Sequence, residues 1–237
     1  MGKLIEFKNV HIELKGQVLF ENISFVINEG DRFMLTGENG SGKSLLLELI
    51  ALGMSGDLLK KYSGLELTGE IIDANGNDLL DPETERKISY VAQSEEIYKN
   101  STLLKQAEIA ANGVGIELDE EKLDYLLERF GLASKKKQRL KNNLSLGQGK
   151  LVHIITRILK LKATNILLLD EPLNHLSFKN SKILNEIILE EIAKKPNLTI
   201  VMVSHCRAIS FVNKTLQYNY DTSSMEIKDY HSYDCFE

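Results

Sequence analysis

The sequence contains few cysteines and no long apolar run, and each absence excludes a class of protein. Its 237 residues include two cysteines, Cys206 and Cys235, too few for a disulfide framework or a zinc cluster. The longest apolar stretches, such as 166–169, fall far short of the roughly 18 residues that a membrane-spanning helix needs. The first residues introduce charge too early for the apolar core of a signal peptide. We therefore expect a cytoplasmic protein that neither spans a membrane nor is secreted.

The charge balance and composition are those of an ordinary globular protein. The chain has 29 Lys and Arg against 34 Asp and Glu, a net charge of −5, and 43% of its residues are hydrophobic. A mildly acidic chain is a poor match for a protein that coats nucleic acid, so no nucleic-acid partner is expected. There is no internal repeat and no long heptad pattern of the coiled-coil type.

The first third of the chain has the pattern of strands and turns. Alternating apolar and polar residues, or runs rich in β-branched residues, predict the strands. A helix is predicted over 44–52, after a glycine-rich segment. Asn75-Gly76 is a hairpin signal. The predicted strands lie at 5–12, 23–27, 32–36 and within 65–92.

The middle of the chain is helical, and the last third alternates helices with wholly apolar strands. Apolar residues at three-four spacing predict helices between 102 and 139. Short apolar strands between helices indicate a parallel sheet covered on both faces. We therefore predict an α/β fold, a mostly parallel sheet flanked by helices, with a helical insertion near 94–141. The later elements are helices at 146–161 and 179–195 and strands at 165–170 and 198–204.

A segment between the third strand and the first helix has the pattern of a phosphate-binding loop. Gly37-Glu38-Asn39-Gly40-Ser41-Gly42-Lys43-Ser44 matches G-x-x-x-x-G-K-S/T in the strand–loop–helix context that this motif requires. Glycines let backbone N–H groups turn toward phosphate oxygens, and the following helix adds the positive end of its dipole. We expect Lys43 to contact the outer phosphates and Ser44 to ligate Mg²⁺, which predicts a P-loop NTPase core.

A pair of acidic residues supplies the carboxylates that a nucleoside triphosphatase needs beside the phosphate loop. Asp170 and Glu171 end the apolar strand at 165–170. Asp170 is the expected carboxylate on the metal side. Side chains alternate along a strand, so Glu171 is expected to point toward an attacking water as the general base.

Between these two sites, Leu144-Ser145-Leu146-Gly147-Gln148 resembles the Leu-Ser-Gly-Gly-Gln signature of the ATP-binding cassette (ABC) ATPases. Other segments match that family in the family's order: a glutamine loop at Gln93, a D-loop over 172–177 and a switch histidine at His205. The resemblance covers residues 4–212 and implies one ABC ATPase domain over 1–237. Its expected parts are an N-terminal antiparallel β-subdomain with the core (1–93 and 142–237) and an inserted α-helical subdomain (94–141).

The resemblance also implies how the sites are shared between two chains. Two cassettes of this family pack head to tail around two ATP, so the signature is implied to bind the ATP held by the partner chain. Ser145 and the Gly147 backbone N–H would meet its γ-phosphate. The signature residues are Ser145, Leu146, Gly147 and Gln148.

Within one chain, the resemblance adds two residues to the predicted site. His205 is implied to bind the γ-phosphate and to take part in catalysis with Glu171 and Lys43. Gln93 is implied to sense nucleotide and metal, joining Ser44 and Asp170 as the metal residues. ATP and Mg²⁺ are the implied cofactors.

The function that this implies is the ATP-hydrolysing motor subunit of an ABC transporter. It would form a homodimer, or a heterodimer with another cassette, and drive integral membrane permease subunits on separate chains. It would lie at the inner face of the cell membrane through those subunits, which are expected to dock around 94–104. The small, isolated cassette and its altered signature favour an export or self-protection system for peptides or lipids.

Two other functions remain open. One is a soluble ABC ATPase that remodels a protein or ribonucleoprotein complex, because Asn174-His175-Leu176 resembles the D-loop of the translation-associated branch. The other is a non-catalytic module whose dimerisation is gated by ATP. This non-catalytic alternative is favoured if Leu146 and Ser177 strongly impair ATP turnover.

Three departures from the family pattern bear on activity. Leu146 replaces the first glycine of the signature, from which we expect an altered rate more than a loss of binding. Ser177 replaces the aspartate that usually ends the D-loop, which puts communication between two ATP sites in doubt. Residues 12–18 contain no aromatic residue to stack on adenine. This last departure predicts weak recognition of the base and GTP as an alternative to ATP.

Overall fold

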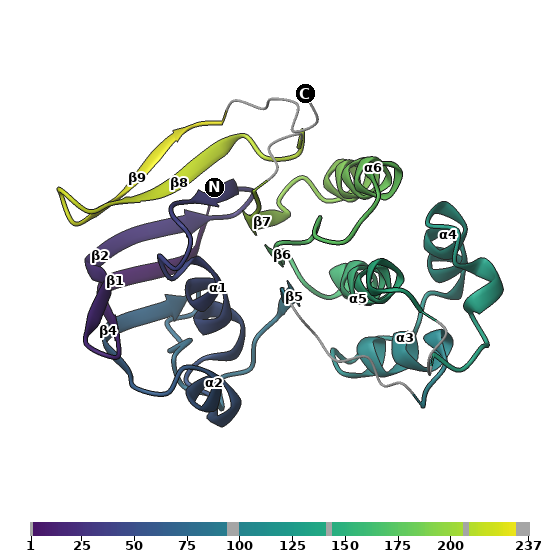
Figure 1. Ribbon diagram of the computed structural model, residues 1–237, viewed down its shortest axis with the longest axis horizontal. Coiled ribbons are helices and arrows are strands. Elements are labelled where there is room, and N and C mark those ends of the chain that lie inside the picture. Colours follow the sequence, from purple (N-terminus) through teal and green to yellow (C-terminus); the bar gives the residue numbers. More distant parts are fainter. Residues whose placement is uncertain (1, 94–99, 141–143, 206–208, 231–237) are drawn as a thin grey trace.

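In a computed structural model, which describes residues 2–93, 100–140, 144–205 and 209–230, strands and helices alternate along much of the chain (Figure 1). The strands are β1 (Lys3–Leu14), β2 (Gln17–Asn28), β3 (Arg32–Thr36), β4 (Leu65–Asp73), β5 (Ile88–Val91), β6 (Ile166–Asp170), β7 (Thr199–Val203), β8 (Lys214–Asn219) and β9 (Ser224–Asp229). The helices are α1 (Lys43–Leu52), α2 (Gly56–Lys61), α3 (Leu103–Asn112), α4 (Glu120–Arg129), α5 (Leu146–Leu159) and α6 (Phe178–Lys194), with 3₁₀ turns at Ala133–Lys135 and Lys160–Lys162.

Two sheets organise these elements. The larger has six strands in the order β5-β6-β7-β3-β8-β9, and all of its neighbours pair in parallel except β8 and β9. The smaller is an antiparallel sheet in the order β2-β1-β4. Figure 1 shows the small sheet with α1 and α2 on one side of the central strands, and α3 to α6 on the other.

The central strands are buried on both faces because their apolar side chains alternate between two cores. Leu168 belongs to the core that contains α1 and the small sheet. Its neighbours Leu167 and Leu169 belong to the core that contains α3 to α6. Side chains of a strand alternate between the faces of the sheet, so a wholly apolar strand such as β6 satisfies both cores at once.

Ion pairs fasten helix α4 to helix α6. Arg129 contacts Glu186 at 2.6 Å and Glu190 at 3.0 Å. The Lys122 Nζ lies 2.7 Å from the Glu191 carboxylate, and both side chains are largely buried. Together with the apolar core that α3, α4 and α5 share, these pairs hold the helical part of the chain against the sheet.

The fold class predicted from the sequence is confirmed, and the strand at 32–36 has the predicted bounds. The chain also forms elements that were not predicted: the short helix α2 and the hairpin β8–β9. Asn75-Gly76 does lie in a turn, which Asp73 closes by accepting hydrogen bonds from the backbone of Asn75 and Asn77. In place of a strand returning from the Asn75-Gly76 turn, the described residues form a single antiparallel bridge between Ile72 and Asp78.

Several predicted features lie outside the described residues: Cys206, Cys235 and most of the segment at 94–104 where membrane subunits were expected to dock. Within the described part of the chain, no helix combines the length and the apolar character needed to cross a bilayer.

Two glycines near the small sheet share a left-handed backbone but differ in the space around them. Gly69 in β4 and Gly76 in the following turn both have left-handed backbone, with φ of +88° and +85°. A Cβ at Gly69 would collide with the backbone carbonyl of Asn9, next to the register shift between β1 and β4. Nothing lies within 4 Å of a Cβ at Gly76.

We expect Gly69→Ala to lower the free energy of unfolding by about 3 kcal/mol, because backbone strain and overpacking add. Its matched control, Gly76→Ala, has only the strain of the left-handed region and is expected to cost about 1 kcal/mol. Urea unfolding of both variants measures the difference. Equal losses of stability would contradict this account of the register.

Candidate functional site

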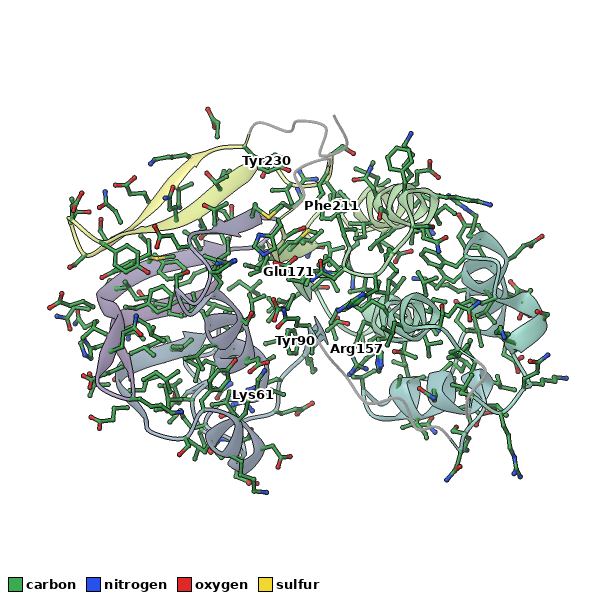
Figure 2. The ribbon with its side chains drawn as sticks, viewed as in Figure 1. Lys61, Tyr90, Arg157, Glu171, Phe211 and Tyr230 are labelled. Atoms are coloured by element: carbon green, nitrogen blue, oxygen red, sulfur yellow. The ribbon has the colours of Figure 1, made fainter. Side chains whose placement is uncertain are left out.

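The candidate site lies where the parallel strands end. The carboxyl ends of parallel strands meet at one edge of a sheet, and the loops that follow them can therefore share a site. Strand β3 leads to the phosphate loop, β5 to Gln93, β6 to Glu171 and β7 to His205. Side chains from all four segments line one cavity of about 440 Å³. Figure 2 shows Glu171 near the middle of the molecule, between the two groups of helices.

The phosphate loop is shaped by glycine. Gly42 has φ +88°, and a Cβ there would lie 2.8 Å from the Phe20 ring, so a larger residue does not fit. Helix α1 begins directly after it, and its first N–H groups are available to an anion. The Lys43 Nζ donates to the carbonyls of Gly37 at 2.9 Å and Glu38 at 2.6 Å. Burial lowers the pKa of the Lys43 ammonium, and the carboxylates of the site oppose that shift.

Asp170 ends strand β6 and meets the first turn of α1. The Ser44 hydroxyl donates to Asp170 Oδ1 at 3.0 Å. The Asp170 side chain is fully buried, and its Oδ2 has no hydrogen-bond partner among the described residues. Burial raises the pKa of the Asp170 carboxyl, while the bond from Ser44 opposes the rise.

Glu171 is held in an unusual backbone conformation. Its φ is +45°, in the left-handed region that non-glycine residues rarely adopt, and its N–H donates to the Val203 carbonyl at 2.9 Å. The Glu171 Oε1 lies 3.3 Å from the His205 Nε2, and the His205 side chain is largely exposed. Burial raises the pKa of the Glu171 carboxyl, and His205 opposes the rise. The change of direction after β6 aims Glu171 into the cavity beside His205.

The residues present fit a divalent cation. Asp170 Oδ2 and Glu171 Oε2 are buried carboxylate oxygens without a hydrogen-bond partner in the described part of the chain. Leaving such oxygens unpaired in a buried place is costly, and oxygen ligands of this kind are those that Mg²⁺ prefers. Ser44, which the sequence predicts as a metal residue, bonds to Asp170, and Gln93 lines the same cavity.

A buried lysine that the sequence did not single out fixes the ends of β5 and β6. Lys150 is 8% exposed. Its Nζ donates to the carbonyls of Ala92 at 2.6 Å, Gln93 at 3.2 Å and Asp170 at 3.4 Å. These contacts tie helix α5 to two strands at the edge where the candidate site lies. Only tertiary structure brings these carbonyls together, so no local pattern could have revealed the role of Lys150.

The signature segment does not line that cavity. Ser145 caps α5: its Oγ accepts from the Gln148 N–H at 3.2 Å, and Gln148 Oε1 accepts from the Ser145 N–H at 3.1 Å. This reciprocal pair is a capping box, which satisfies two N–H groups at the start of the helix. Leu146 is 77% exposed. Gly147 packs so closely on the His175 carbonyl that a Cβ would collide with it.

Ser177, which replaces the aspartate expected at the end of the D-loop, caps helix α6. Its Oγ accepts a hydrogen bond from the Asn180 N–H at 3.3 Å. Serine and aspartate are both good residues at this helix position. The substitution therefore keeps the hydrogen bond that caps the start of α6.

The structure also adds residues to the cavity that the sequence did not select, notably Leu19 and Tyr62. Leu19 also packs near Gly42. Tyr62 follows α2, a helix too short to have a clear periodic pattern. Leu14, within the segment where an aromatic residue was sought, lines the cavity as well.

Comparison with known proteins finds matches over most of the chain. The model of the family described as ABC transporter matches residues 20–174. The ergothioneine transport ATP-binding protein EgtV of Helicobacter pylori is 28% identical over 221 residues, which cover 92% of this chain and 98% of that protein. The zinc uptake system ATP-binding protein ZurA of Listeria innocua is 29% identical over 245 residues, covering 97% of this chain and 90% of that protein.

A solved structure supports the same comparison. The ATP-binding subunit of an ABC transporter superposes with a TM-score of 0.77 at 25% identity, covering 95% of this chain and 90% of that one.

The buried carboxylate predicts how stability depends on pH. Because burial raises the pKa of Glu171 in the folded protein, its contribution to stability is present below the unfolded-state pKa and is lost as pH rises through the folded-state pKa. We expect nucleotide-free Glu171→Gln to be more stable than wild type near pH 7. The difference should shrink as pH falls toward about 4, where the unfolded-state carboxyl titrates.

Urea unfolding of wild type and Glu171→Gln across that pH range measures this effect. Glu128→Gln, on the exposed face of α4, is the matched control for removing one negative charge. A Glu171→Gln variant less stable than wild type at pH 7 would contradict the expectation.

Proposed function

The chain belongs to the family of ABC transporter ATP-binding proteins, which hydrolyse ATP, and we propose that it is the motor subunit of a transporter whose membrane subunits are separate chains. The observation that carries this proposal is the cavity at the end of the parallel strands. Lys43, Ser44, Gln93, Glu171 and His205 all line it. A phosphate loop, a metal-binding edge and a buried base in one cavity are what phosphoryl transfer to water requires.

Each group has a task that its geometry allows. The glycine-rich loop and the N-terminus of α1 would bind the phosphates through backbone N–H groups. Lys43, which bonds to carbonyls of its own loop, would exchange those acceptors for phosphate oxygens. Ser44, Asp170 and Gln93 would hold Mg²⁺. When bound, this ion neutralises the charge of the phosphate oxygens.

Glu171 is the proposed general base. A carboxylate whose pKa is raised by burial is a stronger base toward water than an exposed one, which suits it to accept a proton. His205, 3.3 Å from Glu171, would orient that carboxylate and contact the γ-phosphate.

The position of the signature supports a shared site. Ser145, Leu146, Gly147 and Gln148 lie at the start of α5 and outside the cavity of their own chain. Helix N-termini attract anions, and the exposed start of α5 would meet ATP held by a second cassette packed head to tail. The domain division that goes with this proposal assigns 94–141 to a helical subdomain and the remaining residues, 1–93 and 142–237, to the rest of one domain.

The cargo belongs to the proposal as well. The sequence favours export of peptides or lipids, whereas a relative is named for zinc uptake and another for ergothioneine transport. At 28% to 29% identity, those names describe the relatives, and the membrane subunits decide the cargo of this chain. Membership of a family of ATPases favours a motor over a non-catalytic module gated by ATP.

Glu171→Gln tests the proposed base. We expect ATP turnover to fall by about 100-fold or more, while ATP binding is retained because Lys43 and the phosphate loop are untouched. With ATP and Mg²⁺ the variant should elute as a dimer on size exclusion. Lys43→Ala combined with Glu171→Gln is the control and should remain monomeric. Turnover like that of wild type would remove Glu171 from the mechanism.

Capture of partner chains tests the proposed motor. Tagged Glu171→Gln, purified with ATP and Mg²⁺ in mild detergent from its native cells, should bring down a polytopic membrane protein in stoichiometric amount. The double variant with Lys43→Ala, which lacks the ATP-bound state, is the matched control. Soluble or ribosomal partners without a membrane protein would overturn this proposal and favour the soluble remodelling ATPase.

A further inference from the structure

One aromatic side chain lies in the cavity of the proposed ATP site without a role in the mechanism. Tyr62 is the only phenol or phenyl ring among the described residues that line this cavity. It shares the cavity with the phosphate-loop residues Asn39, Gly40 and Gly42 and with the apolar side chains of Leu14 and Leu19. The ring is partly buried and packs on the core of the small sheet.

The turn after α2 fixes the backbone of Tyr62 against the small sheet. Its N–H donates to the Leu58 carbonyl at 2.9 Å, and its own carbonyl accepts from the Leu65 N–H at 3.1 Å. Gly64 then accepts from the Lys15 N–H at 3.1 Å, and Leu65 pairs with Leu14 at the end of β1. The register of β4 against β1 therefore brings Tyr62 to the part of the cavity that Leu14 lines.

Charged side chains lie beside the Tyr62 ring. The Lys61 Nζ lies over the ring, 5.0 Å from its centroid, and 2.6 Å from the buried carboxylate of Glu48 on α1. The hydroxyl of Tyr90, on β5, donates to the same carboxylate at 3.3 Å. Burial and Glu48 raise the pKa of the Tyr62 hydroxyl to about 12, so the ring stays neutral at physiological pH.

We propose that Tyr62 stacks on the base of the bound nucleoside triphosphate and is the main determinant of nucleotide affinity beyond the phosphates. This inference rests on the proposed ATP site. A planar base gains from contact with an aromatic face, and such stacking is tolerant of the identity of the base because every base has a π-face. Leu14 and Leu19 add apolar walls. The site should therefore accept both purines, with ATP and GTP bound at similar affinity.

Two substitutions separate the ring of Tyr62 from its hydroxyl. We expect Tyr62→Leu to weaken binding of ATP and GTP by about tenfold, the loss typical of removing one base–aromatic stack. Tyr62→Phe keeps the ring and should bind both nucleotides like wild type. Inorganic tripolyphosphate has no base, so its affinity in the presence of Mg²⁺ should be the same for all three proteins. Isothermal titration calorimetry gives each dissociation constant.

The sequence has no tryptophan, which allows a direct spectroscopic test. Tyr62→Trp places a single indole in the protein, and its emission should be quenched by ATP and by GTP but not by tripolyphosphate. Tyr125→Trp is the control. It puts the single indole on α4, which Figure 1 places on the far side of the central strands from α2, and its emission should not change.

The outcomes distinguish this inference from the function on which it rests. If wild type binds neither ATP nor tripolyphosphate, the proposed ATP site fails. If wild type binds both, but Tyr62→Leu binds ATP equally well or Tyr62→Trp emission ignores bound ATP, the role of Tyr62 fails alone. The variant Leu14→Ala gives a further comparison. If Leu14→Ala selectively weakens ATP binding and Tyr62→Leu does not, the base lies on the β1–β2 hairpin and the inference is overturned.

Discussion

The common edge at which the parallel strands end is the constraint on which the rest of the structure depends. Strands β3, β5, β6 and β7 pair in parallel with their neighbours, so the segments that follow them share one edge. That edge brings residues far apart in sequence, from Lys43 to His205, to a single cavity. The apolar strands make this possible, because only strands that bury both faces can lie in the middle of such a sheet.

The residues of the candidate site lower the stability of the folded chain. Asp170 and Glu171 are buried, each with an oxygen that lacks a hydrogen-bond partner within the described residues. Glu171 also has a left-handed backbone. Such features cost stability and persist where the surrounding structure enforces them. A cation would supply a partner for these two oxygens, so the cost of burying them would be offset when a ligand binds.

What the sequence could predict follows from how local each signal is. The phosphate loop and the pair Asp170-Glu171 depend on residues that are adjacent in the chain, and the structure places them together as the motif implies. The β8–β9 hairpin was not predicted, although β8 pairs with β3 as part of the central sheet. Tyr62 and Lys150 reach the site only through long-range packing, which no pattern of neighbouring residues encodes. Their contacts come from the register of β4 on β1 and from helix α5 crossing the strand ends.

Helix α5 is attached to strands of the central sheet at two places along its length. Lys150 bonds to the ends of β5 and β6, and further along the helix the Arg157 Nε donates to the Tyr90 carbonyl at 2.7 Å. The Ser89 hydroxyl donates to the Arg157 carbonyl at 2.7 Å. Because α5 is bonded at both places, it cannot change its angle to β5 and β6 without breaking these hydrogen bonds. The position of the exposed Leu146, at the start of α5, is therefore tied to the ends of β5 and β6.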